Sequence, residues 1–165
     1  MVHPAQLDEQ ELLKDCEIRR QRRSGPGGQH RNKVETGIFV IHQPTDCRAE
    51  ACEKRSQAEN QAIAIHRLRI QLALSHRESP ADERGQLWQQ RVRNRRLNVS
   101  VEHSDFPSML AELFDYLPTV EYSLGDAGTH FGVSASQLVK FLKAQPQAFV
   151  RFNELRTANG QKPLR

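Results

Sequence analysis

The sequence predicts an α+β fold, in which a small three-stranded antiparallel sheet with a long packing helix is followed by a small all-helical module. Short runs of β-branched and aromatic residues occupy the first third of the chain, and apolar residues then recur at helical spacing. Residues 1–100 carry 18 Lys and Arg against 13 Asp and Glu, whereas six of the seven phenylalanines follow position 100. This asymmetry favours two modules of different character.

The strands are predicted from short runs that suit a pleated sheet. Gly37–His42 is the clearest run, because it combines β-branched and aromatic residues. Cys16–Arg23 and Cys47–Glu53 alternate more weakly and are expected to pair with it. Residues 43–46 read Gln-Pro-Thr-Asp, a composition typical of turns. The second and third strands should therefore form a hairpin.

A long helix is predicted after the third strand. Ser56 is a suitable N-cap, and Glu59 three positions later completes a capping-box pattern. The helix should end near residues 76–79, because Pro80 disfavours helix in the residue before it. Its apolar stripe, which we expect to pack against the sheet, comprises Ala58, Ala62, Ile65, Leu68 and Leu72, broadened by Ile63, Ile70 and Leu74.

Residues 79–104 are polar and contain Pro80 and Gly85, so we expect a basic linker between a domain over residues 1–78 and a helical module over residues 105–165. The linker holds a run of four arginines, which either contacts RNA or forms a solvated face. These arginines are Arg91, Arg93, Arg95 and Arg96.

The helical module is expected to contain helices over residues 108–117, 135–144 and 148–158. Residues 127–139 resemble a helix-turn-helix, in which Ser134 would cap the second helix. Two readings stay open: this helix enters a nucleic-acid groove, or it is part of a hairpin that only packs. Lys140 and Lys143 are its only bases.

Residues 24–33 form the most informative segment, with the sequence Ser-Gly-Pro-Gly-Gly-Gln-His-Arg-Asn-Lys. Glycine has no Cβ, so a loop of this kind can press its backbone against a crowded surface. The basic residues on both sides indicate a polyanionic partner. Gln29 offers an amide that exchanges no proton near neutral pH. Chemistry at this loop would therefore consist of positioning and hydrogen bonding.

This segment resembles the Gly-Gly-Gln loop of peptide-chain release factors and of the smaller peptidyl-tRNA hydrolases that rescue stalled ribosomes. The similarity covers about residues 15–75 and is ordered along the chain. Asp46 stands where the family usually has glycine, and Arg31 replaces a small apolar residue. Beyond the loop, the matching residues are Glu35-Thr36, Pro44-Thr45, Arg55-Ser56-Gln57 and Asn60.

The resemblance implies a peptidyl-tRNA hydrolase, an ester hydrolase that acts in the ribosome on the bond between nascent peptide and tRNA. Gly27, Gly28 and Gln29 would be catalytic, and neither a cofactor nor a metal is expected. The implied partners are the ribosome, through its large-subunit rRNA, and peptidyl-tRNA. Because too few residues precede the loop for a decoding domain, we expect release without stop-codon reading, in termination or ribosome rescue. The expected RNA-binding residues are Arg20, Arg22, Arg23, Ser24, His30, Arg31, Asn32, Lys33, Arg55 and Gln57.

Two other functions compete with this interpretation. A non-catalytic nucleic-acid-binding protein would act through the helix-turn-helix-like module and would bind without cleaving an ester. A stand-alone enzyme on free peptidyl-tRNA would need a side-chain base, and His30, beside the loop, is expected to contact phosphate or pack instead. The most useful observation would be release of labelled peptide from ribosomes that hold peptidyl-tRNA, with and without a codon in the decoding site.

The remaining composition indicates a cytoplasmic protein, and we expect it to be a monomer. Cys16, Cys47 and Cys52 are odd in number and lack the spacing of a disulfide framework, which favours reduced thiols. The charged residues among the first fifteen are mostly acidic and include no arginine, unlike those of a secretory or transit signal. No apolar run approaches the length of a membrane span, so no membrane partner is expected.

Overall fold

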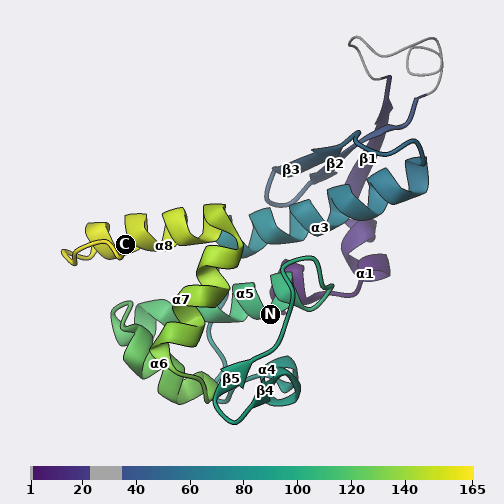
Figure 1. Cartoon of the computed structure of the whole chain (residues 1–165). Helices are drawn as coiled ribbons and strands as arrows, with labels where there is room; N and C mark the ends of the chain where they lie inside the picture. The colour runs from purple at the N-terminus through teal and green to yellow at the C-terminus, as the bar shows by residue number, and fades with distance from the viewer. Residues whose placement is uncertain (1, 23–34) are drawn as a thin grey trace. The chain divides into compact units, whose positions relative to one another are not determined.

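The computed structural model describes residues 2–22 and 35–165, which form two compact units, Val2–His76 and Arg77–Arg165. Figure 1 labels their helices and strands. Within the described residues, no helix is both long enough and apolar enough to cross a membrane.

The first unit is a three-stranded antiparallel sheet in the order β1-β2-β3, with α3 packed on β2 and β3 (Figure 1). Gln21 at the end of β1 is paired with Gly37 at the start of β2, and Ile38 is paired with Ala51 of β3. This arrangement confirms the predicted α+β class. The elements are η1 (Pro4–Gln6), α1 (Glu9–Lys14), β1 (Cys16–Gln21), β2 (Gly37–His42), β3 (Cys47–Ala51) and α3 (Gln57–Ser75).

The core of this unit lies between the sheet and α3. Val40 of β2 faces Ala49 of β3 in the register, and both are buried. Leu68 and Leu72 of α3 are fully buried, as the predicted stripe requires. Two members of the predicted apolar stripe, Ala58 and Ala62, are exposed. Asn60 and Ala64 are buried on this part of the helix instead. Alanine suits either environment, so its spacing alone does not identify the buried face.

The turn between β2 and β3 accommodates Asp46 without glycine. Asp46 has φ 55°, in the left-handed region that asparagine and aspartate tolerate better than other side chains. Its carboxylate pairs with Arg48 at 2.8 Å. The departure from the glycine usual in the family therefore leaves a tight hairpin between two paired strands.

The second unit is mainly helical and surrounds an aromatic core. Phe106, Phe114, Phe131 and Phe152 are fully buried. Residues 105–165 contain the three predicted helices and an additional one, α6. The elements are α4 (Gln86–Arg91), β4 (Val92–Arg93), β5 (Arg96–Leu97), α5 (Phe106–Tyr116), η2 (Leu117–Val120), α6 (Leu124–Phe131), α7 (Ala135–Ala144) and α8 (Pro146–Ala158).

Residues 79–104 differ from the expected linker, because they carry α4 and the β4–β5 hairpin. Trp88 of α4 is 0% exposed. The centroid of its ring lies 4.3 Å from that of the Phe131 ring and 5.6 Å from that of the Phe141 ring. A buried tryptophan contributes a large apolar surface. This side chain therefore packs an otherwise polar segment against the helical core.

The junction between α6 and α7 has the local features of the predicted helix-turn-helix. Gly132 ends α6 with φ 74°, a conformation that favours glycine. Ser134 caps α7, with its hydroxyl accepting from the Gln137 N–H at 3.3 Å. A Cβ added at Gly128 would lie 2.7 Å from the carbonyl oxygen of Val133, so the two segments meet closely there.

Candidate functional site

The glycine-rich segment of the sequence connects the paired ends of β1 and β2. The expected catalytic residues Gly27, Gly28 and Gln29 lie outside the described residues. The described structure therefore shows the frame that carries this segment. Six expected RNA contacts also lie outside it, namely Arg23, Ser24, His30, Arg31, Asn32 and Lys33.

Asn60, in the first turn of α3, holds two connections of the frame together. Its side-chain Nδ2 donates to the carbonyl oxygen of Thr36 at 2.7 Å and to that of Lys54 at 3.0 Å. Its Oδ1 accepts from the Lys54 N–H at 2.9 Å. Asn60 is 0% exposed, so these bonds satisfy an amide that would be costly to bury alone. The chain entering β2 and the chain leaving β3 are thus joined.

Gln57 adds a second link on the same side. Its Nε2 donates to the carbonyl oxygen of Glu35 at 3.1 Å. The carboxylate of Glu35 in turn lies 3.3 Å from Nε of Arg22, which follows β1. The Arg22 and Glu35 side chains are largely exposed, so this ion pair contributes little stability by itself. It does place one acid and one base at the two ends of the undescribed segment.

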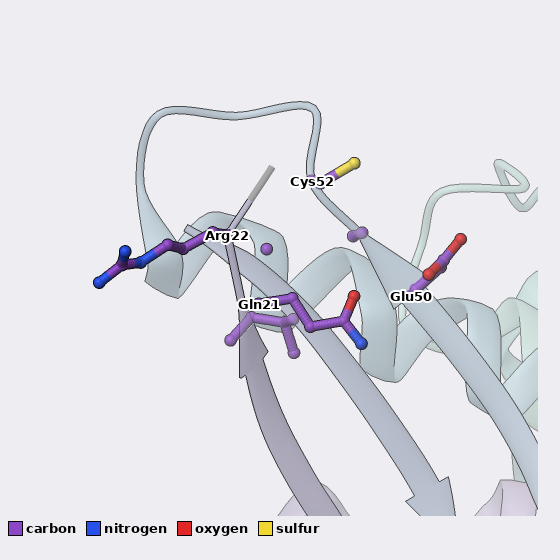
Figure 2. Close-up of a pocket in the computed structure, with 7 residues that line it drawn as sticks. Gln21, Arg22, Glu50 and Cys52 are labelled. Carbon is purple, nitrogen blue, oxygen red and sulfur yellow. The ribbon is translucent and has the colours of Figure 1, made fainter. Parts of the chain in front are cut away.

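Glycine at position 37 suits the close approach of the strand ends. A Cβ there would lie 3.0 Å from the carbonyl oxygen of Gln21 and 3.6 Å from Cβ of Cys52. Beside it lies an open cleft of about 180 Å³, also lined by Arg22 and Glu50. Figure 2 shows the Arg22 guanidinium pointing away from Glu50 and Cys52. The cleft is polar and small, so we assign it no ligand.

Two further predicted RNA contacts are described, and the structure leaves both exposed. Arg20 lies on β1 opposite Ile38, and Arg55 precedes α3. Among the described residues, neither guanidinium has an ion-pair partner. The structure thus brings Gln57 and Arg22 together through Glu35, whereas Arg20 and Arg55 remain separate cations.

The end of β3 is held by a charged group that the sequence reasoning did not single out. Arg67 of α3 donates to the carbonyl oxygen of Glu50 at 2.8 Å and pairs with Glu53 at 2.5 Å. The hydrogen bond from Arg67 lowers the pKa of the Glu53 carboxyl below its ordinary value. The carboxylate also accepts from the Cys52 N–H at 2.8 Å. Arg67 therefore fixes the chain leaving the sheet.

The structural role of Asn60 was recognisable only in part from the sequence. Asn60 belongs to the ordered motif series, but it was not among the expected site residues. Its spacing of four and eight from Ala64 and Leu68 places it on the buried face of α3. A polar residue on such a face requires partners, and this is the available signal. The identity of those partners depends on Thr36 and Lys54, which only the fold brings close.

Comparison with known proteins finds a family model, described as the RF-1 domain, that matches residues 7–105. Peptide chain release factor 1 of Xylella fastidiosa is 43% identical over 67 residues, which are 41% of this chain and 19% of that protein. Peptide chain release factor 1 of Granulibacter bethesdensis is 32% identical over 131 residues, covering 68% of this chain and 36% of that protein.

A mitochondrial peptide chain release factor 1-like protein of Mus musculus is 37% identical over 71 residues, covering 43% of this chain and 19% of that protein. The chain therefore spans between 19% and 36% of the length of these three relatives.

Proposed function

The chain belongs to the RF-1 domain family, and from this we propose that it hydrolyses the peptidyl-tRNA ester in the ribosome and so releases the nascent peptide. Gly27, Gly28 and Gln29 are the proposed catalytic residues. The proposed RNA contacts are ten charged or polar residues that flank this tripeptide in the sequence or lie near the start of α3: Arg20, Arg22, Arg23, Ser24, His30, Arg31, Asn32, Lys33, Arg55 and Gln57.

One observation supports this proposal most strongly. Motif residues that are far apart in the sequence converge on the base of the glycine-rich segment: Asn60 binds the carbonyl of Thr36, and Gln57 binds that of Glu35. Such a frame holds the two ends of a loop on rigid elements. A reactive tripeptide needs this, because small misplacement of catalytic groups is costly.

The proposed chemistry uses main-chain groups and water. Ester hydrolysis needs water placed against the carbonyl carbon and donors for the developing negative charge. Pre-aimed donors of this kind contribute about 3 kcal/mol each. In the proposal, the Gln29 N–H donates to the leaving ribose oxygen, while its side chain admits water and excludes larger nucleophiles. Gly27 and Gly28 allow the backbone to approach in a pocket lined by RNA.

We further propose that release needs no stop codon in the decoding site. We assign no decoding role to residues 106–165, which follow the segment matched by the RF-1 domain. Hydrolysis would then depend on access of the loop to the ester rather than on a stop codon. Both termination-like release and rescue of stalled ribosomes fit this chemistry.

The test is release of labelled peptide from ribosomes that hold peptidyl-tRNA. Gly28→Ala should slow release about a hundredfold or more, because a Cβ both restricts the backbone and displaces the donors. Gln29→Ala should cost less, since its main-chain N–H survives. Gly125→Ala is the control, because its added Cβ meets only Ser123 Oγ at 3.8 Å. Release by Gly28→Ala at the parent rate, with ribosome binding intact, would refute the proposal.

A further inference from the structure

The β4–β5 hairpin separates the run of four arginines into two kinds. Arg91, at the end of α4, is held by Asp105 at 2.7 Å and by His103 at 2.9 Å. The other three, Arg93, Arg95 and Arg96, are exposed. Among the described residues, their side chains have no hydrogen-bond or ion-pair partner. One arginine of the run is therefore structural, and three carry charge that the protein does not neutralise.

The hairpin holds these arginines at positions that folding alone does not favour. Arg93 and Arg96 are directly paired across the two strands, where like charges repel. Asn94 and Arg95 form the two-residue turn with φ 50° and 61°. Positive φ at both positions suits Asn-Gly, whereas arginine is strained at the second. Strain and repulsion retained on an exposed tip point to a role for the charges themselves.

The hairpin is anchored on the helix-turn-helix-like module. The Leu97 N–H donates to Oε1 of Gln137 in α7 at 3.2 Å. Lys140 is exposed and lies three residues beyond Gln137, on the same side of α7. Lys143, by contrast, donates to the carbonyl oxygen of Arg165 at 2.9 Å and lies over the ring of Phe149. The unneutralised cations of this region are thus mainly on the hairpin.

We infer that the arginine hairpin, residues 92–97, is a wing that grips the phosphate backbone of folded RNA, beside α7. Guanidinium groups are planar and bind phosphate oxygens in pairs, which suits a rigid display of three of them. A membrane surface fits poorly, because Val92 and Leu97, the apolar residues of the hairpin, are partly buried. The choice of RNA over DNA rests on the proposed ribosomal function.

The test measures binding of the full chain to a short RNA duplex and to a DNA duplex of the same sequence, by fluorescence anisotropy over a range of KCl concentrations. The test variant replaces Arg93, Arg95 and Arg96 by Gln. The control replaces Lys14, Arg48 and Arg151 by Gln, which removes the same charge from residues paired with acids. The test variant should bind RNA about tenfold more weakly, and its salt slope should fall by about 2 to 3.

Arg95→Gly separates a binding role from a structural one. Glycine relieves the positive φ of the turn, so the melting temperature should stay the same or rise. RNA affinity should nevertheless fall, because one phosphate contact is lost. If Arg95 had only a structural role, the melting temperature and the RNA affinity of this variant would change in the same direction.

Three outcomes would overturn the inference: unchanged affinity of the test variant, equal loss in the control, or tighter binding to DNA than to RNA. Failure of the proposed function is distinguishable, because these binding measurements require no ester cleavage. A chain that binds RNA through the hairpin and releases no peptide would refute the hydrolase and retain the wing.

Discussion

Asn60 is the side chain on which the frame of the loop depends most. Asn60→Ala removes its three hydrogen bonds, so the part-buried main-chain groups of Thr36 and Lys54 lose this partner. We expect the sheet unit to lose about 3 kcal/mol of unfolding free energy. Hydrogen exchange of the β2 amides measures this loss. Asn98→Ala, at an exposed position, should cost less than about 0.5 kcal/mol. Equal protection in the two variants would show that Asn60 is no clamp.

His42 makes the stability of the same unit depend on pH. Burial lowers the pKa of its imidazole, the nearby His76 lowers it further, and Asp15 opposes both. Between this lowered pKa and the ordinary value of about 6.5, the unfolded chain binds a proton that the native chain does not. Stability is therefore complete above that interval and falls as the pH falls through it.

The His42→Gln variant should flatten this dependence, because it removes the titrating group. Thermal unfolding followed by far-ultraviolet circular dichroism, at several pH values from about 8 down to 5, is the measurement. A parent and variant with parallel profiles would assign the pH dependence to other groups. His42 also bonds Thr45 through Nδ1 at 2.8 Å, so the variant is compared by slope rather than by absolute stability.

Between elements, the junction of α6 and α7 depends on Gly128. Gly128→Ala would place a Cβ 2.7 Å from a backbone oxygen, which cannot move as a flexible side chain can. We expect a loss of about 1 to 3 kcal/mol. Gly125→Ala in the same helix should be neutral or stabilising by up to about 1 kcal/mol.

The chain's one tryptophan, Trp88, reports on this unit, so its fluorescence in a urea titration measures both glycine variants. The Asn60→Ala substitution lies in the other unit and serves as a reference for the Trp88 fluorescence measurement. A Gly128→Ala transition that coincides with that of Gly125→Ala would show that α6 and α7 can separate without cost.

Elements with strong local patterns were predictable from the sequence. Gly37–His42 matches β2 in full, because its β-branched and aromatic residues suit a buried central strand. The capping residues Ser56 and Ser134 both accept hydrogen bonds at their helix starts. The strand expected to reach Arg23 is described as far as Gln21, since local alternation does not define where pairing ends.

For the molecule as a whole, the sequence predicted two modules, but it did not reveal how residues 79–104 are used. That segment is polar, and Trp88 connects it to the rings of Phe131 and Phe141, which follow about 40 to 50 positions later. Periodicity carries no information on such distant contacts. The partners of Asn60 and the separation of Arg91 from its neighbours are likewise tertiary properties.

We propose that the chain cleaves the peptidyl-tRNA ester on the ribosome and that this cleavage needs no stop codon. The most direct measurement is peptide release by the full chain from three substrates: ribosomes with a sense codon in the decoding site, ribosomes with that site empty, and peptidyl-tRNA free in solution. We predict release from both kinds of ribosome and none from free peptidyl-tRNA. Release that requires a stop codon, release from free peptidyl-tRNA at the same rate, or binding without any release would contradict the proposed function.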